Sequence, residues 1–321
     1  MMFKGVDFWP HDRTFQIMKM RKVFVIISAV AFLAAVAMLA TKGLNFGIDF
    51  KGGSLFEIKS RSGPVDIAAL RSKLNALGLG DVQIQGLDKP EEALIRIEEQ
   101  KGGEAGAGIE KAQQIAATKV QKALGEGIEI RRTEVVGPAV SGELKEAGFI
   151  AVLFAILGIL LYIWFRFEWQ FGIASIIALV HDIIITLGVF SLLGLEFGLT
   201  EVAALLTLAG YSINDTVVVF DRIRENLRRY KKLPLIELMN KSINQTLSRT
   251  IITSLTTLIA VLAIWIFGTE VIQGFAFALI FGILIGTWSS IFVASPFLLW
   301  IGVKRDWSSE SSSKKPVGAS V

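Results

Sequence analysis

The stretch "GYSINDTVVVFDRIRENLRR", residues 210–229, begins inside an apolar run and ends in a cluster of arginines. The run that leads into it, "LTEVAALLTLAGYSINDTVVVF" (199–220), is long enough to cross a bilayer, because a spanning helix needs about 20 mostly apolar residues. It nevertheless carries Asn214 and Asp215 side by side. Since a carboxylate in hydrocarbon costs several kcal/mol, Asp215 indicates a functional position inside a membrane-spanning helix.

Other stretches of the chain are as apolar as this one. Of the 321 residues, 52% are apolar and only 19% are charged, and the mean hydropathy is +0.56. This composition predicts a polytopic α-helical membrane protein with six transmembrane helices. The first is expected at 22–41, and the other five lie in a membrane domain over 148–303, at about 148–166, 170–193, 199–221, 249–267 and 272–303.

The basic residues indicate how the helices are oriented. Lysines and arginines gather in the N-terminal segment 1–21, in the tail 304–321 and between the fourth and fifth spans, whereas the short loops on the other side carry glutamates and no basic residue. The positive-inside rule therefore predicts that both termini are cytoplasmic. The net charge of +4 reflects this topology, and no nucleic-acid partner is expected. Residues 18–40 also resemble a cleavable signal peptide, but the apolar run favours a retained anchor.

The segment 42–147, between the first two spans, has the pattern of a folded domain. Strands are expected at 54–60, 81–87, 91–99 and 128–137, and helices at 65–78 and 109–125, with a glycine-rich loop at 101–108. The order β-α-β-β-α-β predicts a small α+β ferredoxin-like domain on the periplasmic side. Because the chain has no cysteine, this domain must fold without disulfides.

Two charged side chains in neighbouring spans suggest a proton relay. Asp215 is expected roughly 10 Å inside Arg222 along the fourth helix, and Arg249 enters the fifth span at a comparable depth. Burial and a nearby cation act in opposite directions on the pKa of a carboxyl group, and this combination suits proton exchange near neutral pH. We therefore interpret Asp215 and Arg249 as members of a relay, with Asn214 as a supporting neighbour.

The third and fifth spans add further polar positions. Asp182 lies near the middle of the third span and is the third expected member of the relay. Beside it, His181 could equally hold a neighbouring carboxylate or serine. In the fifth span, Thr250 and Thr253 belong to a polar stripe that is typical of a hydrated path. All of these positions also have a structural interpretation, in which they only fix helix packing.

Several residues have simpler interpretations. Gly282 and Gly286 predict close helix packing, and Asp49 is expected at a turn or helix cap. Glu196, Glu201 and Glu270 are interpreted as solvated loop charges. In the basic loop 222–248, an apolar stripe is expected to lie on the membrane surface or on a partner.

The chain carries no signature of an enzyme. It lacks a Walker lysine loop, a nucleophile elbow, an HExxH motif and a CxxC motif. No catalytic residue, cofactor or metal ligand is therefore expected. If the chain does work, a proton gradient or a partner would have to supply the energy.

Four motifs in order resemble those of the SecF members of the SecD/SecF family of bacterial protein-export proteins. They are "FGIDFKGGSLFEI" (46–58), "ALVHDIIITLG" (178–188), "GYSINDTVVVFDRIRENLRR" (210–229) and "NQTLSRTIITSLTTL" (244–258). The resemblance runs over about 45–303. It implies one six-helix half of an assembly of the RND superfamily, located in the bacterial inner membrane. In that family the aspartate and arginine at the positions of Asp215 and Arg249 are linked to proton passage, and Asp182 falls in the "HD" motif.

The resemblance also implies partners. These are SecD as the other half, the SecYEG channel with YajC, the lipid bilayer and the exported unfolded polypeptide, on which the proton motive force would act. Two alternatives stay open. The first is a proton-coupled half-transporter of lipid or small solute, and the second is a scaffold subunit that conducts nothing.

Overall fold

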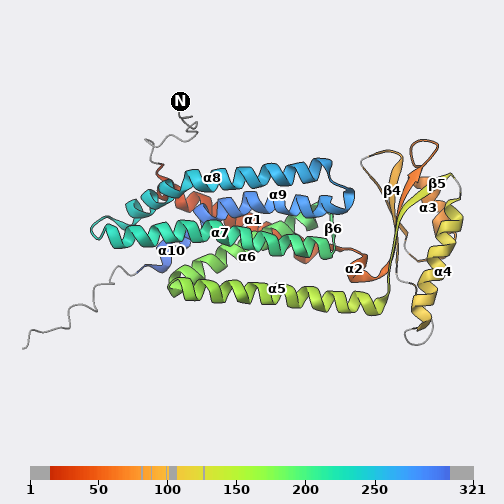
Figure 1. Ribbon diagram of the computed structural model, residues 1–321, viewed down its shortest axis with the longest axis horizontal. Coiled ribbons are helices and arrows are strands. Elements are labelled where there is room, and N and C mark those ends of the chain that lie inside the picture. Colours follow the sequence, from red (N-terminus) through yellow and green to blue (C-terminus); the bar gives the residue numbers. More distant parts are fainter. Residues whose placement is uncertain are drawn as a thin grey trace, which may run out of the picture. The chain divides into compact units, whose positions relative to one another are not determined.

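The computed structural model describes residues 15–80, 82–87, 89–98, 100, 107–125 and 127–303 of the chain, which divides into two units (Figure 1). The first unit contains the chain up to Gly43, Phe154–Leu195 and the chain from Ala203 onward. The second contains Leu44–Leu153 and Glu196–Val202. Most of the N-terminal segment expected at 1–21, the tail at 304–321 and most of the glycine-rich loop at 101–108 lie outside the described residues.

Six helical stretches in the described part of the chain are long and apolar enough to cross a membrane. This confirms the prediction of a polytopic α-helical membrane protein. The helices that form them are α1 (Arg21–Thr41, preceded by the 3₁₀ turn Ile17–Met20), α5 (Pro138–Arg166), α6 (Trp169–Leu193), α7 (Leu199–Arg229), α8 (Leu235–Phe267) and α9 (Glu270–Ser289), which continues into α10 (Ser295–Ile301). Figure 1 shows α1 and α6–α9 gathered in one bundle.

The fourth and fifth spans are longer than the sequence predicts. α7 runs to Arg229 instead of residue 221, and α8 begins at Leu235 instead of residue 249. The apolar stripe of this segment was expected on the membrane surface or on a partner, and this prediction is wrong for most of its residues. The stripe packs into the core of the first unit, where Leu238, Met239 and Ile243 are fully buried. The helices extend past the apolar run because this packing stabilises them.

The last span is also divided. A π-helical turn, Ser290–Ala294, separates α9 from α10, and Pro296 follows in the first turn of α10. Proline has no N–H group to donate to the preceding turn, and a wider turn is one way in which a helix accommodates that loss. Where a single helix was expected over 272–303, the structure therefore has α9 and α10, and α10 ends at Ile301.

The first unit has buried helices and exposed ones. About half of the most apolar part of α6, α7 and the last span is buried, whereas less than a fifth of that part is buried in α1, α5 and α8. Glycines allow the buried helices to approach closely. A Cβ atom on Gly188 would lie 2.3 Å from the Cβ of Ala35 on α1, and one on Gly282 would lie 2.4 Å from Leu208 on α7. With Gly286 against Ser212, this confirms the prediction that Gly282 and Gly286 serve close packing.

The second unit contains a four-stranded antiparallel sheet, in the order β3-β4-β2-β5. Its strands are β2 (Gly53–Ser60), β3 (Val82–Gly86), β4 (Glu92–Ile97) and β5 (Ile128–Val136), with α3 (Ile67–Asn75) after β2 and α4 (Ala107–Leu124) after β4. The predicted β-α-β-β-α-β order is present. Side chains from the sheet and both helices form its core, including Phe56, Ile58, Leu74, Ile95 and Val120.

A short parallel pair of strands lies apart from this sheet. β1 (Asn45–Phe46) pairs with β6 (Glu196–Phe197), which precedes α7. After β1 comes α2 (Ile48–Lys51), whose Asp49 accepts a 2.9 Å hydrogen bond from the backbone N–H of Leu199, the first residue of α7. Asp49 therefore caps a helix, as predicted, but the helix is distant in sequence.

A buried polar site on α6, α7, α8 and α9

The Asp182 carboxylate is the centre of one polar cluster in the first unit. It is completely buried and accepts hydrogen bonds from the hydroxyls of Ser212 on α7 at 2.5 Å and Ser289 on α9 at 2.7 Å. His181 Nδ1 lies 2.9 Å from the other carboxylate oxygen. Polar groups buried in a membrane domain need such partners, because no water replaces them. Asp182 therefore joins three helices at one point.

His181 extends this cluster toward α1. Its ring stacks on Phe32 with a centroid distance of 6.4 Å, and its Nε2 atom is buried without a hydrogen-bond partner among the described residues. His181 contacts the neighbouring carboxylate, which is one of the contacts expected of it, and a part for His181 in the relay stays a prediction. Thr186 and Ser175 donate to backbone carbonyls of their own helix, and among the described residues their hydroxyls make no hydrogen bond to another span.

The Asp215 carboxylate lies in a second cluster, one helical turn further along α7 from Ser212. It is buried and is 3.4 Å from the Ser254 hydroxyl on α8. The same hydroxyl is 2.7 Å from that of Thr287 on α9. Asp215 thus has a single hydrogen-bond partner in the described part of the chain, whereas Asp182 has three. Asp215 is the less constrained of the two carboxylates.

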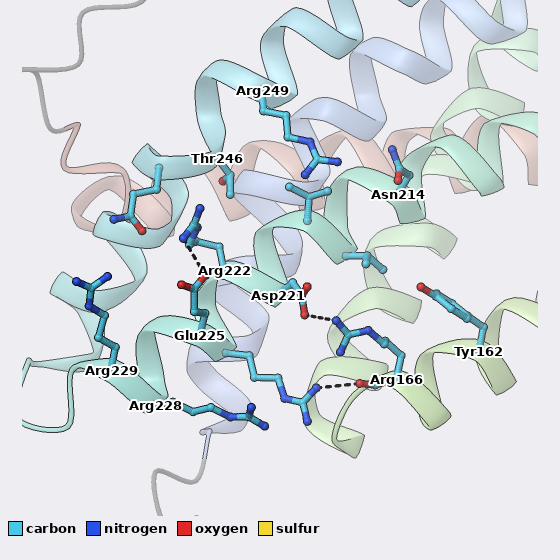
Figure 2. Close-up of a pocket in the computed structure, with 14 residues that line it drawn as sticks. Tyr162, Arg166, Asn214, Asp221, Arg222, Glu225, Arg228, Arg229, Thr246 and Arg249 are labelled. Atoms are coloured by element: carbon cyan, nitrogen blue, oxygen red, sulfur yellow. Dashed lines mark hydrogen bonds and ion pairs between the residues drawn. The ribbon is translucent and has the colours of Figure 1, made fainter.

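The Arg249 guanidinium is near Asp215 without touching it. Electrostatic attraction acts between the two groups, yet among the described residues no hydrogen bond or ion pair joins them. Instead Arg249 projects from α8 into an open pocket of about 870 Å³ (Figure 2), which Asn214 also lines. The two predicted partners are therefore close in space, with Asp215 buried and Arg249 exposed.

The threonines of α8 bond mainly within their own helix, and the hydrated path expected along them stays a prediction. Thr256 and Thr257 donate to backbone carbonyls of their own helix, including the carbonyl of Thr253. Thr250 is buried, and its hydroxyl has no hydrogen-bond partner among the described residues. Hydroxyls that bond within their own helix add no link between helices. Ser254, one turn after Thr250, makes the link from α8 to α7 and α9.

Sequence reasoning missed four hydroxyl residues of the site. Ser212 and Ser254 lie three and four residues from positions that were identified, at spacings that place them on the same helix face. Thr287 and Ser289 stand in the run "GTWSS" (286–290), where adjacent hydroxyl residues interrupt an apolar stretch. Through these two residues α9 contacts both clusters. The signal was therefore the presence of small polar residues inside the spans, not of charged ones.

The loop glutamates are not the solvated charges that the sequence suggests. Glu201 is buried and accepts a 2.8 Å hydrogen bond from the backbone N–H of Gly198, so it caps α7. Glu196 forms an ion pair with Arg96 on β4, inside the second unit. Burial raises the pKa of the Glu196 carboxyl group, and the Arg96 charge opposes part of that effect. For Glu270, the side chain is outside the described set.

Comparison with known proteins places these features in a family. Residues 116–304 match the family described as protein export membrane protein SecD/SecF, C-terminal, and residues 37–63 match the SecD/SecF GG motif. The first match covers more than half of the chain, so the chain belongs to the SecD/SecF family of protein-export membrane proteins. All of the site residues on α6, α7, α8 and α9 lie inside that match.

Within this family the chain is similar to SecF proteins over most of its length. It is 49% identical over 286 residues to protein translocase subunit SecF of Desulfurispirillum indicum, covering 88% of this chain and 90% of that protein. It is 48% identical to SecF of Cereibacter sphaeroides, covering 85% and 86% of the two chains.

Two relatives are longer than this chain and match it over only part of their length. Protein translocase subunit SecDF of Brucella abortus is 40% identical, and the match covers 89% of this chain but 37% of that one. The crystal structure of SecDF, a translocon-associated membrane protein from Thermus thermophilus, superposes with a TM-score of 0.80 at 38% identity. That match covers 91% of this chain and 39% of the SecDF chain, so this chain corresponds to about two fifths of SecDF.

Proposed function

We propose that this translocase subunit of the SecF type uses the proton motive force to drive a late stage of protein export. Its partners would be SecD, the SecYEG channel and YajC, and its substrate an exported unfolded polypeptide. Relatives in which one chain carries the name SecDF support the pairing with SecD. No cofactor and no enzymatic step enter this proposal.

The distribution of basic residues supports a location and an orientation. The multi-pass chain would lie in the bacterial inner membrane with both termini in the cytoplasm. The expected domain at 42–147 would then be periplasmic, where polypeptide emerges. The short connection between α6 and α7 contains Glu196 and no basic residue, as the positive-inside rule requires of a loop outside the cytoplasm.

The observation that carries the proposal is the environment of Asp215. Its carboxylate is buried in a spanning helix, bonds one hydroxyl and feels the charge of Arg249 without being fixed in an ion pair. A carboxyl group held this loosely can change protonation without breaking an interhelical network. Protonation would remove its negative charge and therefore its attraction to Arg249 on α8. The position of α7 relative to α8 would then change.

The energy available is sufficient for such a change. One proton that crosses 100 mV releases about 2.3 kcal/mol. This shifts a two-state equilibrium by roughly 50-fold. The contact of Ser254 with Thr287 offers a path by which a movement of α8 reaches α9.

The test replaces Asp215 with Asn and measures gradient-dependent protein export in membrane vesicles. We expect export in the absence of a gradient to be unchanged and its stimulation by the gradient to be lost. The matched control is Asp221→Asn, which removes an exposed carboxylate from the same helix, where it pairs with Arg166 at 2.5 Å. If Asp215→Asn responded to the gradient as fully as the control, Asp215 would have no part in the coupling and a scaffold function would be favoured.

A further inference from the structure

The pocket that Arg249 enters is strongly basic. It lies between the last turns of α5, the second half of α7 and α8, and its volume is about 870 Å³ (Figure 2). Of the residues that the structure describes, six arginines and two carboxylates line it, an excess of four positive charges. The arginines are Arg166, Arg222, Arg224, Arg228, Arg229 and Arg249.

The two carboxylates of this pocket are already engaged. Asp221 pairs with Arg166 at 2.5 Å, and Glu225 pairs with Arg222 at 2.8 Å (Figure 2). Arg224 donates to the backbone carbonyl of Arg166 instead of an acid. Among the described residues that line the pocket, carboxylates are therefore fewer than guanidinium groups, two against six. Guanidinium groups bind phosphate with two parallel hydrogen bonds, which makes an arginine-rich pocket suited to a phosphate group.

The surroundings of the pocket are those of a lipid-water boundary. Tyr162, on the pocket wall, is half exposed, and Trp164 and Phe165 beside it on α5 are 76% and 91% exposed. Tyrosine and tryptophan gather at the level of the headgroups in membrane proteins. On α8, the turn that follows Arg249 exposes Ile251 and Ile252. Apolar surface therefore continues from the pocket along both of these helices.

From these observations we propose that the pocket binds the headgroup of an anionic phospholipid. The phosphate would lie among the arginines of α7, and the acyl chains would lie on the exposed apolar faces of α5 and α8. A free phosphate ion would satisfy the arginines but would leave these faces without a ligand. The volume suits a phosphoglycerol headgroup, since pockets for small ligands commonly measure about 300–1,000 Å³. Basic pockets between membrane-spanning helices bind the headgroups of anionic lipids in other membrane proteins.

The experiment measures binding of phosphatidylglycerol and phosphatidylcholine to the full chain in a neutral detergent, by native mass spectrometry. The pocket variant is Arg222→Gln with Arg229→Gln. Its control is Lys22→Gln with Lys232→Gln, which removes two exposed positive charges that do not line the pocket. A third variant, Glu225→Gln, removes an anion from the pocket.

We expect phosphatidylglycerol to bind at least tenfold more tightly than phosphatidylcholine. The pocket variant should lose about tenfold or more in affinity, because charge-assisted hydrogen bonds disappear. The control should bind as the original chain does, and Glu225→Gln should bind several-fold more tightly. That gain cannot result from misfolding, so it keeps the test decisive if the double variant folds poorly.

Three results would overturn the proposal. Equal losses in the pocket variant and the control would indicate diffuse surface attraction. Complete displacement of phosphatidylglycerol by millimolar inorganic phosphate would indicate a site for free anions. Loss of the bound lipid when the chain is co-purified with SecD would indicate that acidic groups of a protein fill the pocket. None of these outcomes depends on gradient-driven export, so they are distinguishable from a failure of the proposed function.

Discussion

Asp182 on α6 and Ser212 on α7 are joined by a 2.5 Å hydrogen bond inside the first unit, where both side chains are almost completely buried. Ser289 on α9 donates to the same carboxylate oxygen. The loosely held Asp215 lies only one turn from Ser212 along α7. One helix therefore carries a fixed polar contact and a nearly free carboxylate on adjacent turns. Asp182 is placed to keep α6, α7 and α9 in register while changes occur around Asp215.

The first prediction concerns this register. Replacing Ser212 or Ser289 with Ala should lower the free energy of unfolding in detergent by about 1–3 kcal/mol, because the buried carboxylate loses a donor. Thr207→Ala is the control, since Thr207 is exposed and its hydroxyl donates to its own helix. Thermal unfolding of the purified variants measures the difference. Equal stabilities for Ser212→Ala and the control would show that the contact is dispensable.

The second prediction concerns the close approach of α1 and α6. Gly188→Ala would place a Cβ atom 2.3 Å from that of Ala35, so α1 must shift, at a cost of about 1–3 kcal/mol. Gly158→Ala on α5 meets no atom within 4 Å and should be neutral or slightly stabilising. The unfolding temperatures of the two variants are compared. A tolerated Gly188→Ala would mean that α1 is not packed tightly against α6.

The third prediction concerns the helical hairpin of α7 and α8. The buried amide of Asn226 donates at 2.8 Å to both Ser242 and Gln245. Asn226→Leu should destabilise the protein by about 1–3 kcal/mol, because these two polar groups lose their donor. Limited proteolysis near residues 230–234 should become faster. Unchanged cleavage in Asn226→Leu, with Arg228→Gln as a control on the same turn, would contradict a structural role for the amide.

The fourth prediction is a pH dependence in the second unit. The raised pKa of Glu196 means that the folded state binds its proton more tightly than the unfolded state. Its contribution to stability is therefore complete below the ordinary value of 4.5 and is lost as pH rises through the folded-state pKa. Glu196→Gln should lack this loss. Arg96→Gln should extend it to higher pH, since the opposing cation is gone.

Unfolding curves recorded between pH 4 and 8 measure this effect. The comparison is the difference in stability between the original chain and each variant at every pH. A difference for Glu196→Gln that does not change with pH would show that this carboxyl group titrates alike in both states.

The spans and the sheet could be predicted because their signals are local. Six apolar stretches and one β-α-β-β-α-β pattern are each contained in short windows of sequence, and the structure has both. The helix ends could not be predicted in the same way. The extension of α8 back to Leu235 depends on Met239 and Ile243 packing in the core of the first unit, and hydropathy alone does not report such packing.

The site was predictable only in part, for a related reason. Charged residues in apolar runs are rare, so Asp182, Asp215 and Arg249 stand out in the sequence. Ser212, Ser254, Thr287 and Ser289 do not, because a hydroxyl residue in a spanning helix can equally bond its own backbone. Thr256 does so, whereas Ser254, only two residues away, contacts another helix. Which of the two occurs is decided by the neighbouring helix.

The π-helical turn at Ser290–Ala294 changes the direction in which the side chains after it point, compared with a continuous α-helix. One added residue offsets all following side chains by about 100° about the helix axis. On a continuous α-helix, Ser289 and Leu298 would lie on opposite faces. With the π-helical turn between them, both are buried. Deleting one residue from this turn would rotate Leu298 away from the interior while leaving Ser289 and its carboxylate contact where they are.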